Sequence, residues 1–149
     1  MIVIAHNIRS LHNVGSIFRS CDAFAVEKLF LTGYSGIPPR KEIAKVSLGS
    51  EHRVPWQFDE QVMNVLHDLL KQGYILVALE NGPGSIMIDT FSSNQPIALI
   101  LGNEVEGIEQ DVLTLCGAQV EIPMPGKKQS LNVSVATGIA LFALRTNAS

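Results

Sequence analysis

The sequence predicts a single α/β domain in which helices cover both faces of a parallel sheet. Five short apolar runs are continuous rather than alternating, as in strands that are buried on both faces. These runs comprise residues 2–5, 29–32, 74–79, 97–101 and 119–122. Helical spacing of apolar residues separates most of them, and this alternation is typical of parallel sheets. No repeat or linker divides the chain, so residues 1–149 are expected to form one domain.

The first predicted helix follows Asn13, which we expect to be its N-cap. Its apolar residues repeat at i, i+3, i+4 and i+7, and they are Val14, Ile17, Phe18 and Cys21. A second helix is predicted over residues 62–70, before the stop signal Gly73, and a short third helix over residues 108–115.

The last predicted helix occupies residues 130–145, with Ser130 placed to cap it. One apolar face of this helix, of the kind that packs against a core, is formed by Leu131, Val135, Ile139 and Phe142. Residues 33–56 and 82–96 are rich in glycine, proline and polar side chains, so we expect two long loops there.

Composition indicates a soluble cytoplasmic protein. The amino terminus has no basic region, and no apolar run approaches the roughly 20 residues that span a bilayer. The two cysteines, Cys21 and Cys116, lie in apolar stretches, so we expect buried thiols rather than a disulfide.

Charge is unevenly distributed along the chain, whose net charge is −3. The segment from Arg9 to Arg53 holds seven basic and four acidic residues, a local charge of +3. Such a segment suits contact with nucleic-acid phosphates. Ordinary solvated surface explains the same charges equally well.

Several familiar motifs are incomplete. Residues 82–84 follow a strand as in a dinucleotide-binding fingerprint, but Pro83 lacks an amide that a phosphate needs. Residues 102–107 have the glycine spacing of a phosphate loop, but no lysine follows. Residues 48–52 lack the second glycine of a nucleophile elbow, and the histidines and cysteines show no metal-ligand spacing. We therefore predict no nicotinamide cofactor, no NTPase, no hydrolase and no metal.

Polar residues remain at the expected strand ends and helix starts, where α/β sheets bind ligands. They include Asn13, Arg19, Asn103, Glu104, Ser130 and Asn132. Each also has a structural explanation on its own, because Asn13 and Ser130 can cap helices and Arg19 can be a solvated helix residue.

Taken together, three blocks of sequence resemble the motifs of the SpoU/TrmH family of RNA ribose methyltransferases. The first block contains Asn13, Gly15 and Arg19, the second runs over residues 100–108, and the third runs over residues 122–136. They occur in the family's order, and the resemblance extends over residues 7–145.

The resemblance implies the SPOUT architecture, a parallel sheet whose C-terminal segment is threaded through a loop as a trefoil knot, in a homodimer. It also implies transfer of a methyl group from S-adenosylmethionine to a ribose 2′-hydroxyl of RNA. The implied cofactor pocket comprises Leu79, Glu80, Gly102, Asn103, Gly107, Ile122, Met124, Ser130 and Leu131.

The resemblance further implies that Arg19 is the catalytic residue and that Asn13, Glu104, Ser130 and Asn132 assist it. Because a guanidinium stays protonated at neutral pH, we expect Arg19 to hold an RNA phosphate and stabilise alkoxide charge rather than to act as a base. The expected RNA-binding residues, most of them in the segment 33–53, are Arg19, Arg40, Lys41, Lys45 and Arg53.

Two alternatives stay open: a knotted RNA-binding protein without catalysis, and a SPOUT methyltransferase that acts on a base or a small molecule. Intact Arg19 and Glu104 favour catalysis, and the Ser130-Leu131-Asn132 motif favours the ribose-directed branch. Few residues precede the first motif, so we expect the catalytic dimer itself to recognise RNA, with tRNA preferred over rRNA.

Overall fold

The computed structural model describes residues 1–148, in which one seven-stranded sheet is flanked by five α-helices. The strands are β1 (Ile2–His6), β2 (Lys28–Thr32), β3 (Trp56–Asp59), β4 (Ile75–Leu79), β5 (Ile86–Met87), β6 (Ile97–Leu101) and β7 (Ala118–Glu121). The helices are α1 (Leu11–Ala23), α2 (Lys41–Ser47), α3 (Val62–Lys71), α4 (Gln110–Leu115) and α5 (Val133–Asn147), with 3-10 turns η1 (Ser50–His52) and η2 (Ile88–Thr90).

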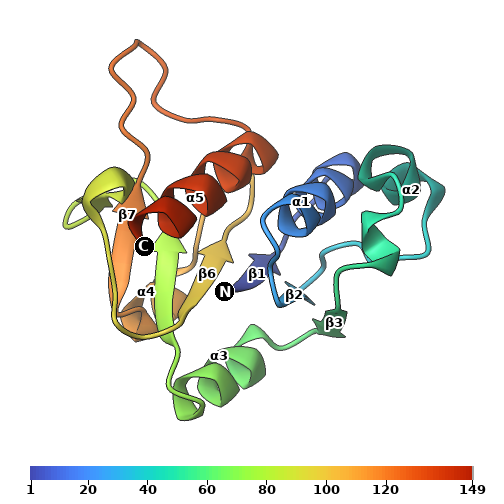
Figure 1. Cartoon of the computed structure of the whole chain (residues 1–149), viewed down its shortest axis with the longest axis horizontal. Coiled ribbons are helices and arrows are strands. Elements are labelled where there is room, and N and C mark those ends of the chain that lie inside the picture. Colours follow the sequence, from blue (N-terminus) through green and yellow to red (C-terminus); the bar gives the residue numbers. More distant parts are fainter. Residues whose placement is uncertain (149) are drawn as a thin grey trace.

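The strand order is β3-β2-β1-β6-β4-β7-β5, and every neighbouring pair is parallel. This confirms the predicted parallel α/β sheet. The two late strands lie between earlier ones: β6 separates β1 from β4, and β7 separates β4 from β5 (Figure 1). The strand order therefore reverses at β1, and ligands bind α/β sheets at such reversals.

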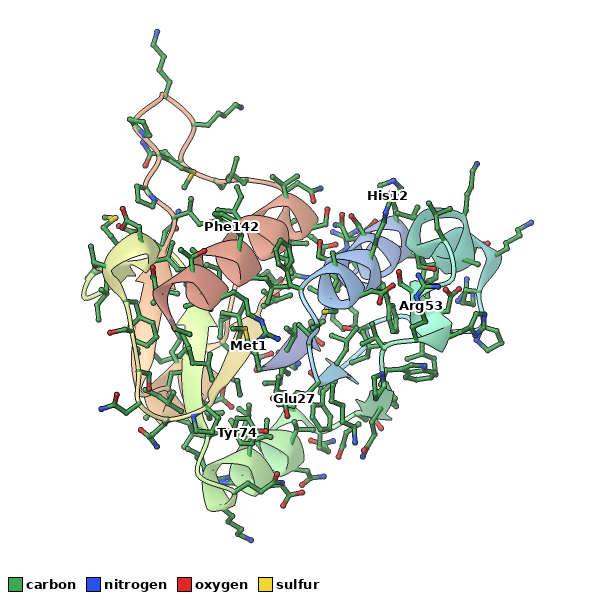
Figure 2. The ribbon with its side chains drawn as sticks, viewed as in Figure 1. Met1, His12, Glu27, Arg53, Tyr74 and Phe142 are labelled. Carbon is green, nitrogen blue, oxygen red and sulfur yellow. The ribbon has the colours of Figure 1, made fainter. Side chains whose placement is uncertain are left out.

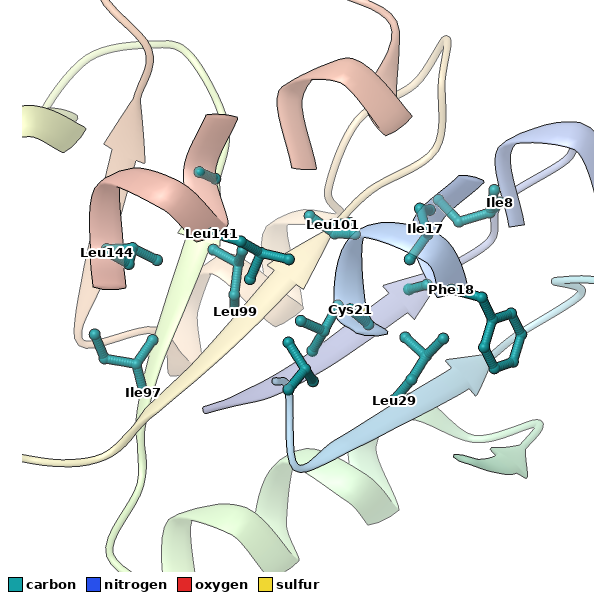
Figure 3. Packing of buried hydrophobic residues seen from close by; sticks show 14 of the residues in the cluster. Ile8, Ile17, Phe18, Cys21, Leu29, Ile97, Leu99, Leu101, Leu141 and Leu144 are labelled. Carbon is teal, nitrogen blue, oxygen red and sulfur yellow. The ribbon is translucent and has the colours of Figure 1, made fainter. Parts of the chain in front are cut away.

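Helices cover both faces of the sheet, with α1 and α5 on one face and α3 and α4 on the other (Figure 1). On the first face, Leu141 and Leu144 of α5 pack with Leu99 of β6 (Figure 3). The next residue in β6, Ile100, belongs instead to the cluster beneath α3 and α4. Successive strand residues thus enter opposite cores, which explains why the apolar runs are continuous.

The caps of α1 and α5 differ from the prediction. The N-cap of α1 is Ser10, whose Oγ accepts a hydrogen bond from the N–H of Asn13 at 3.1 Å. The N-cap of α5 is Asn132, whose side-chain oxygen accepts from the N–H of Ser134 at 2.8 Å. Serine and asparagine both suit a cap, so tertiary contacts decide which residue takes that position: the Asn13 amide is bound to another loop, and Ser130 lines a cavity.

The predicted long loops contain short regular elements. Residues 33–56 include α2 and η1 and reach the start of β3, and residues 82–96 include β5 and η2. The helix α2 buries only Ile43 and Ser47, and both residues of β5 are exposed. Neither α2 nor β5 therefore has the regular spacing of apolar residues from which a helix or strand is predicted.

The apolar face predicted for α5 is exposed. Val135, Ile139 and Phe142 have exposed fractions of 52%, 40% and 61%, and Phe142 is marked on α5 in Figure 2. A different face, which includes Leu141 and Leu144, is buried against the sheet. Because α5 is apolar on both sides, its periodicity does not identify the buried one.

The two cysteines are free thiols, as predicted. Cys21 is buried, and partial burial raises the pKa of Cys116 to about 11, so this thiol is protonated at neutral pH. Within residues 1–148, the structure contains no helix with the length and apolar character that a membrane span requires.

Candidate active site

A cavity of about 280 Å³ opens at the carboxyl ends of β4, β6 and β7. Leu79 and Leu101 end β4 and β6, and Ile122 follows β7. The segment between β7 and α5 closes another side of the cavity with Ser130 and Leu131. Three strand ends and one long connection therefore meet where a parallel sheet is expected to bind its ligand.

The structure brings all nine predicted cofactor residues into the lining of this cavity. They are Leu79, Glu80, Gly102, Asn103, Gly107, Ile122, Met124, Ser130 and Leu131. Leu79, Ile122 and Leu131 contribute apolar side chains, and the turn after β6 contributes two glycines together with the polar residue Asn103. This combination suits a nucleoside, whose base needs apolar walls with a few fixed hydrogen-bonding groups.

The turn after β6 is organised by Asn103, whose side chain is buried. Its backbone N–H donates to the carbonyl of Gly107 at 3.1 Å, and the N–H of Gly107 donates back to the Asn103 carbonyl at 3.0 Å. The Asn103 Oδ1 accepts from the N–H groups of Val105 and Glu106, each at 2.8 Å. Gly107 has a φ of 73°, a left-handed conformation that glycine adopts without strain.

Glu80 holds this turn to the end of β4. Its Oε2 accepts from the N–H of Ile108 at 2.8 Å. A Cβ placed on Gly107 comes within 2.3 Å of the same oxygen, and a Cβ on Gly102 comes within 2.6 Å of the backbone carbon of Gly107. A methyl group on Gly102 would therefore meet backbone, and one on Gly107 would have to displace the Glu80 carboxylate that holds the turn.

Gly102→Ala is expected to displace the turn, because the added Cβ meets backbone rather than a flexible side chain. Overpacking of this kind costs about 1–3 kcal/mol, so we expect S-adenosylmethionine affinity to fall roughly tenfold. Calorimetry measures this change. Gly126→Ala is the matched control, because nothing lies within 4 Å of its added Cβ. Equal affinity of the two variants would contradict the predicted role of the turn.

Glu104 joins this turn to the start of α1. Its Oε1 accepts from the N–H of Arg9 at 2.9 Å. Its Oε2 accepts from the N–H of Ser10 at 3.0 Å and from the Asn13 amide at 2.9 Å. Burial opposes ionisation most strongly, but the donors of Arg9, Asn13 and Ser10 together outweigh it and hold the pKa of Glu104 below its ordinary value. A carboxylate at a helix amino terminus also complements the helix dipole.

Glu104 is expected to make stability depend on acid pH. Its pKa is lowered in the folded state, so its contribution is complete above the unfolded-state pKa of about 4.3 and disappears as pH falls through the folded-state pKa. Glu104→Gln should therefore lower the free energy of unfolding by about 1–3 kcal/mol at pH 7. Denaturant unfolding at several pH values should show the two proteins converging below pH ~4. A constant difference would contradict this prediction.

A more open groove adjoins the cavity on the α1 side, with a volume of about 590 Å³. It is lined by four of the five predicted catalytic residues, namely Asn13, Glu104, Ser130 and Asn132. Arg9 and Ser10 also line it, and the sequence interpretation did not include them among the site residues. Their position directly before the first motif was the available signal.

The structure does not bring Arg19 to this groove. Arg19 is exposed and lines another depression, between α1 and the segment 47–53, together with Arg53. It lies six residues after Asn13 in α1, about 9 Å along the axis and on a different face. In a single chain, the predicted catalytic arginine is therefore separated from the other four residues.

The remaining predicted RNA-binding residues are exposed on and near α2 rather than on a loop. Arg40 forms an ion pair with Glu42 at 3.4 Å. Arg53 donates to Asp22 through Nε at 2.8 Å and Nη2 at 2.6 Å, and this interaction holds the pKa of Asp22 below its ordinary value. Figure 2 marks Arg53 beside α2. Lys41 and Lys45 project without an ion pair recorded in the described part of the chain.

The site combines a cavity with apolar walls and, beside it, a more open groove with amide, hydroxyl and carboxylate groups, so it offers room for two substrates. Within residues 1–148, no group of three or more His, Cys, Asp and Glu side chains is arranged to hold a metal ion. Glu104 belongs to both spaces, so the turn that shapes the cavity also shapes the groove.

Comparison with protein families gives a match to the SpoU rRNA Methylase family over residues 1–142. The tRNA (guanosine(18)-2′-O)-methyltransferase of Aquifex aeolicus is 34% identical over 145 residues, which cover 95% of this chain and 67% of that protein. The 23S rRNA (guanosine-2′-O-)-methyltransferase RlmB of Xanthomonas axonopodis pv. citri is 32% identical over 142 residues, covering 95% and 57%. The chain therefore spans about half to two thirds of these relatives.

Solved structures have a similar fold. The AdoMet-bound rRNA methyltransferase from Sinorhizobium meliloti superposes with a TM-score of 0.91 at 29% identity, covering 97% of this chain and 55% of that one. The TrmH/SpoU tRNA modifying enzyme of A. aeolicus superposes with a TM-score of 0.88 at 31% identity, covering 98% and 74%.

Proposed function

Because this chain belongs to the SpoU rRNA methylase family, we propose that it transfers a methyl group from S-adenosylmethionine to a ribose 2′-hydroxyl of RNA. The observation that carries the proposal is the cavity after β4, β6 and β7, whose lining includes all nine residues named from the family's motifs. Relatives described as tRNA and 23S rRNA guanosine 2′-O-methyltransferases support the same reaction.

The cavity fits the proposed cofactor. The closed turn at Gly102 and Gly107 lets backbone approach a ligand closely, and Leu79, Ile122 and Leu131 supply apolar walls. S-adenosylmethionine supplies a methyl group on a sulfonium sulfur, which becomes a neutral thioether when that carbon–sulfur bond breaks and the bond to the ribose oxygen forms. The proton of the ribose hydroxyl leaves to water or to a phosphate.

The residues of the groove would orient the ribose. Asn13 and Asn132 offer amides and Ser130 a hydroxyl, while Glu104 fixes the start of α1 through its three hydrogen bonds. Arg19 would hold an RNA phosphate and stabilise the developing alkoxide charge. Positioning is the main demand on such a site, because displacement at carbon requires aligned reactants.

We propose that the active unit is a homodimer in which Arg19 of one protomer completes the site of the other. The exposed residues Val135, Ile139 and Phe142 of α5 form an apolar face of the kind that marks a protein interface. The ring of Phe24, at the end of α1, lies 6.4 Å from that of Phe142, so the face continues toward the helix that carries Arg19. A second copy would thus supply the residue that the groove lacks.

The proposal includes the trefoil knot of the family. Two features support it: β6 and β7 are inserted between earlier strands, and the Asn81 amide, just after β4, donates to the carbonyl of Gln129 at 2.6 Å. The connection between β7 and α5 therefore lies against the loop after β4. For the RNA substrate we favour tRNA over rRNA.

Methyl transfer is tested with methyl-labelled S-adenosylmethionine and separate tRNA and rRNA fractions, followed by digestion to nucleosides. We expect label in 2′-O-methylnucleosides, predominantly from tRNA. Label on a base would favour the base-directed alternative. RNA binding without cofactor binding or label would favour the non-catalytic alternative and contradict the proposed function.

A further inference from the structure

We propose that Tyr34 is a stacking platform for an unpaired nucleobase of the RNA, at or next to the modified nucleotide. This inference rests on the proposed function. Tyr34 follows β2, in the segment that leads to α2, and its exposed fraction is 58%. It is an aromatic side chain kept in solvent beside the candidate active site.

The ring of Tyr34 is exposed but held at both ends. Its hydroxyl accepts a hydrogen bond from the Asn103 amide at 2.6 Å, and its backbone N–H donates to Oδ1 of Asn7 at 3.1 Å. The same Asn103 amide donates to the carbonyl of Asn7 at 3.0 Å. A side chain fixed in this way loses little entropy when a ligand contacts its face.

The backbone after Tyr34 is equally constrained. Ser35 is buried, and its hydroxyl donates to the carbonyl of Ala5 at 3.0 Å and accepts from the N–H of Ile8 at 2.8 Å. Gly36 lies so close to α1 that an added Cβ would be 2.1 Å from the side chain of Leu11. These contacts prevent the segment from folding the ring into the core.

The partner of Tyr34 places it at the active site. Asn103 lines the cofactor cavity and holds the turn that also carries Glu104. A nucleotide whose ribose enters the groove beside Glu104 would therefore bring a base, its own or its neighbour's, to the ring of Tyr34. Farther along the same segment, Arg40 and Lys41 are exposed and carry charge that attracts phosphates.

An RNA base is the occupant that this chemistry favours. Unpaired bases bind proteins by stacking on aromatic rings, whatever their hydrogen-bonding pattern. A ring needed only to hold Asn103 would gain free energy from burial, because its apolar surface would leave water. The exposed ring leaves that surface available to a ligand.

Tyr34→Leu removes the aromatic face, and Tyr34→Phe removes only the hydroxyl that binds Asn103. Loss of one stacked base typically costs about 1–3 kcal/mol, so we expect Tyr34→Leu to raise the KM for unfractionated tRNA roughly tenfold. The kcat and the S-adenosylmethionine affinity of Tyr34→Leu should match those of Tyr34→Phe. Tyr34→Phe should keep most of the tRNA affinity of the unaltered protein. Phe58→Leu is the matched control, because Phe58 is an aromatic residue with an exposed fraction of 40% on the edge strand β3.

An unchanged KM in Tyr34→Leu would overturn the inference. So would an equal rise in Tyr34→Phe, which would assign the effect to the bond with Asn103 alone. Thermal unfolding of each variant shows that the change is not a loss of fold. Failure of the proposed function is a different result: the unaltered protein would transfer no methyl group to any RNA fraction. In that case, tRNA binding measured without cofactor still tests the role of Tyr34.

Discussion

Arg19→Lys is expected to lower kcat for RNA methylation by about 10²- to 10³-fold, the usual effect of removing a group that stabilises transition-state charge. Lysine keeps the positive charge but cannot form the planar, two-point contact of a guanidinium with a phosphate. Because Arg19 lies outside the cofactor cavity, the S-adenosylmethionine affinity of the Arg19→Lys protein should not change. Steady-state kinetics with tRNA and calorimetry with the cofactor measure the two effects. Full activity of Arg19→Lys would contradict the two-point contact.

Mixing two impaired variants at a limiting cofactor concentration determines which protomer supplies Arg19. Arg19→Ala retains the cavity, and Gly102→Ala retains the arginine but binds the cofactor about tenfold more weakly. If Arg19 acts across the dimer, a mixed dimer has one intact site of two, and an equal mixture should recover about a quarter of full activity. If Arg19 acts within its own chain, the mixture should show no more than the mean activity of the two variants, and the proposed dimeric site would be wrong.

Phe142→Asp is expected to convert the protein to a monomer and to abolish methyl transfer. The aspartate places a charge on the exposed apolar face of α5, where burial against a second copy would leave it without a partner. Because Phe142 is 61% exposed, the fold of each chain should persist. Light scattering gives the mass, circular dichroism the fold, and labelled cofactor the activity.

Leu70→Asp is the control for this change. Leu70 is 39% exposed on α3, on the opposite face of the sheet from α5, so the same charge there should leave both mass and activity unchanged. A monomeric but fully active Phe142→Asp protein would show that the site does not need a second copy. A dimeric variant would show that α5 is not the interface.

The sequence predicted the sheet well because its central strands are buried on both faces. Residues such as Leu99 and Ile100 enter opposite cores, and the resulting continuous apolar runs are unmistakable in the chain. The edge strand β3 and the two-residue strand β5 are largely exposed, so no continuous apolar run predicts them from the sequence. Which of two apolar faces of α5 is buried also depends on tertiary packing rather than on spacing.

The cavity was predictable for a different reason. Its nine predicted residues follow from the family resemblance, and three of them, Gly102, Asn103 and Gly107, lie within six residues of one another in one motif. Asn13 shows the limit: as a residue type it suits a helix cap, but its amide is bound to Glu104, which is distant in sequence. The separation of Arg19 from the groove depends on the folded structure. The spacing of residues along α1 does not show whether Arg19 belongs to the site of its own chain or to that of a partner.

The position of β6 has a consequence for how the chain acquires its structure. β1 is made first, yet its second neighbour is β6, and the other neighbour of β6 is β4. The inner edges of β1 and β4 therefore stay unpaired until residue 101 has left the ribosome, and unpaired apolar edges recruit other chains. The other edge of β4 waits longer still, because its neighbour β7 is the last strand to be made. We expect productive folding to be slow and to depend on shielding these two edges during translation.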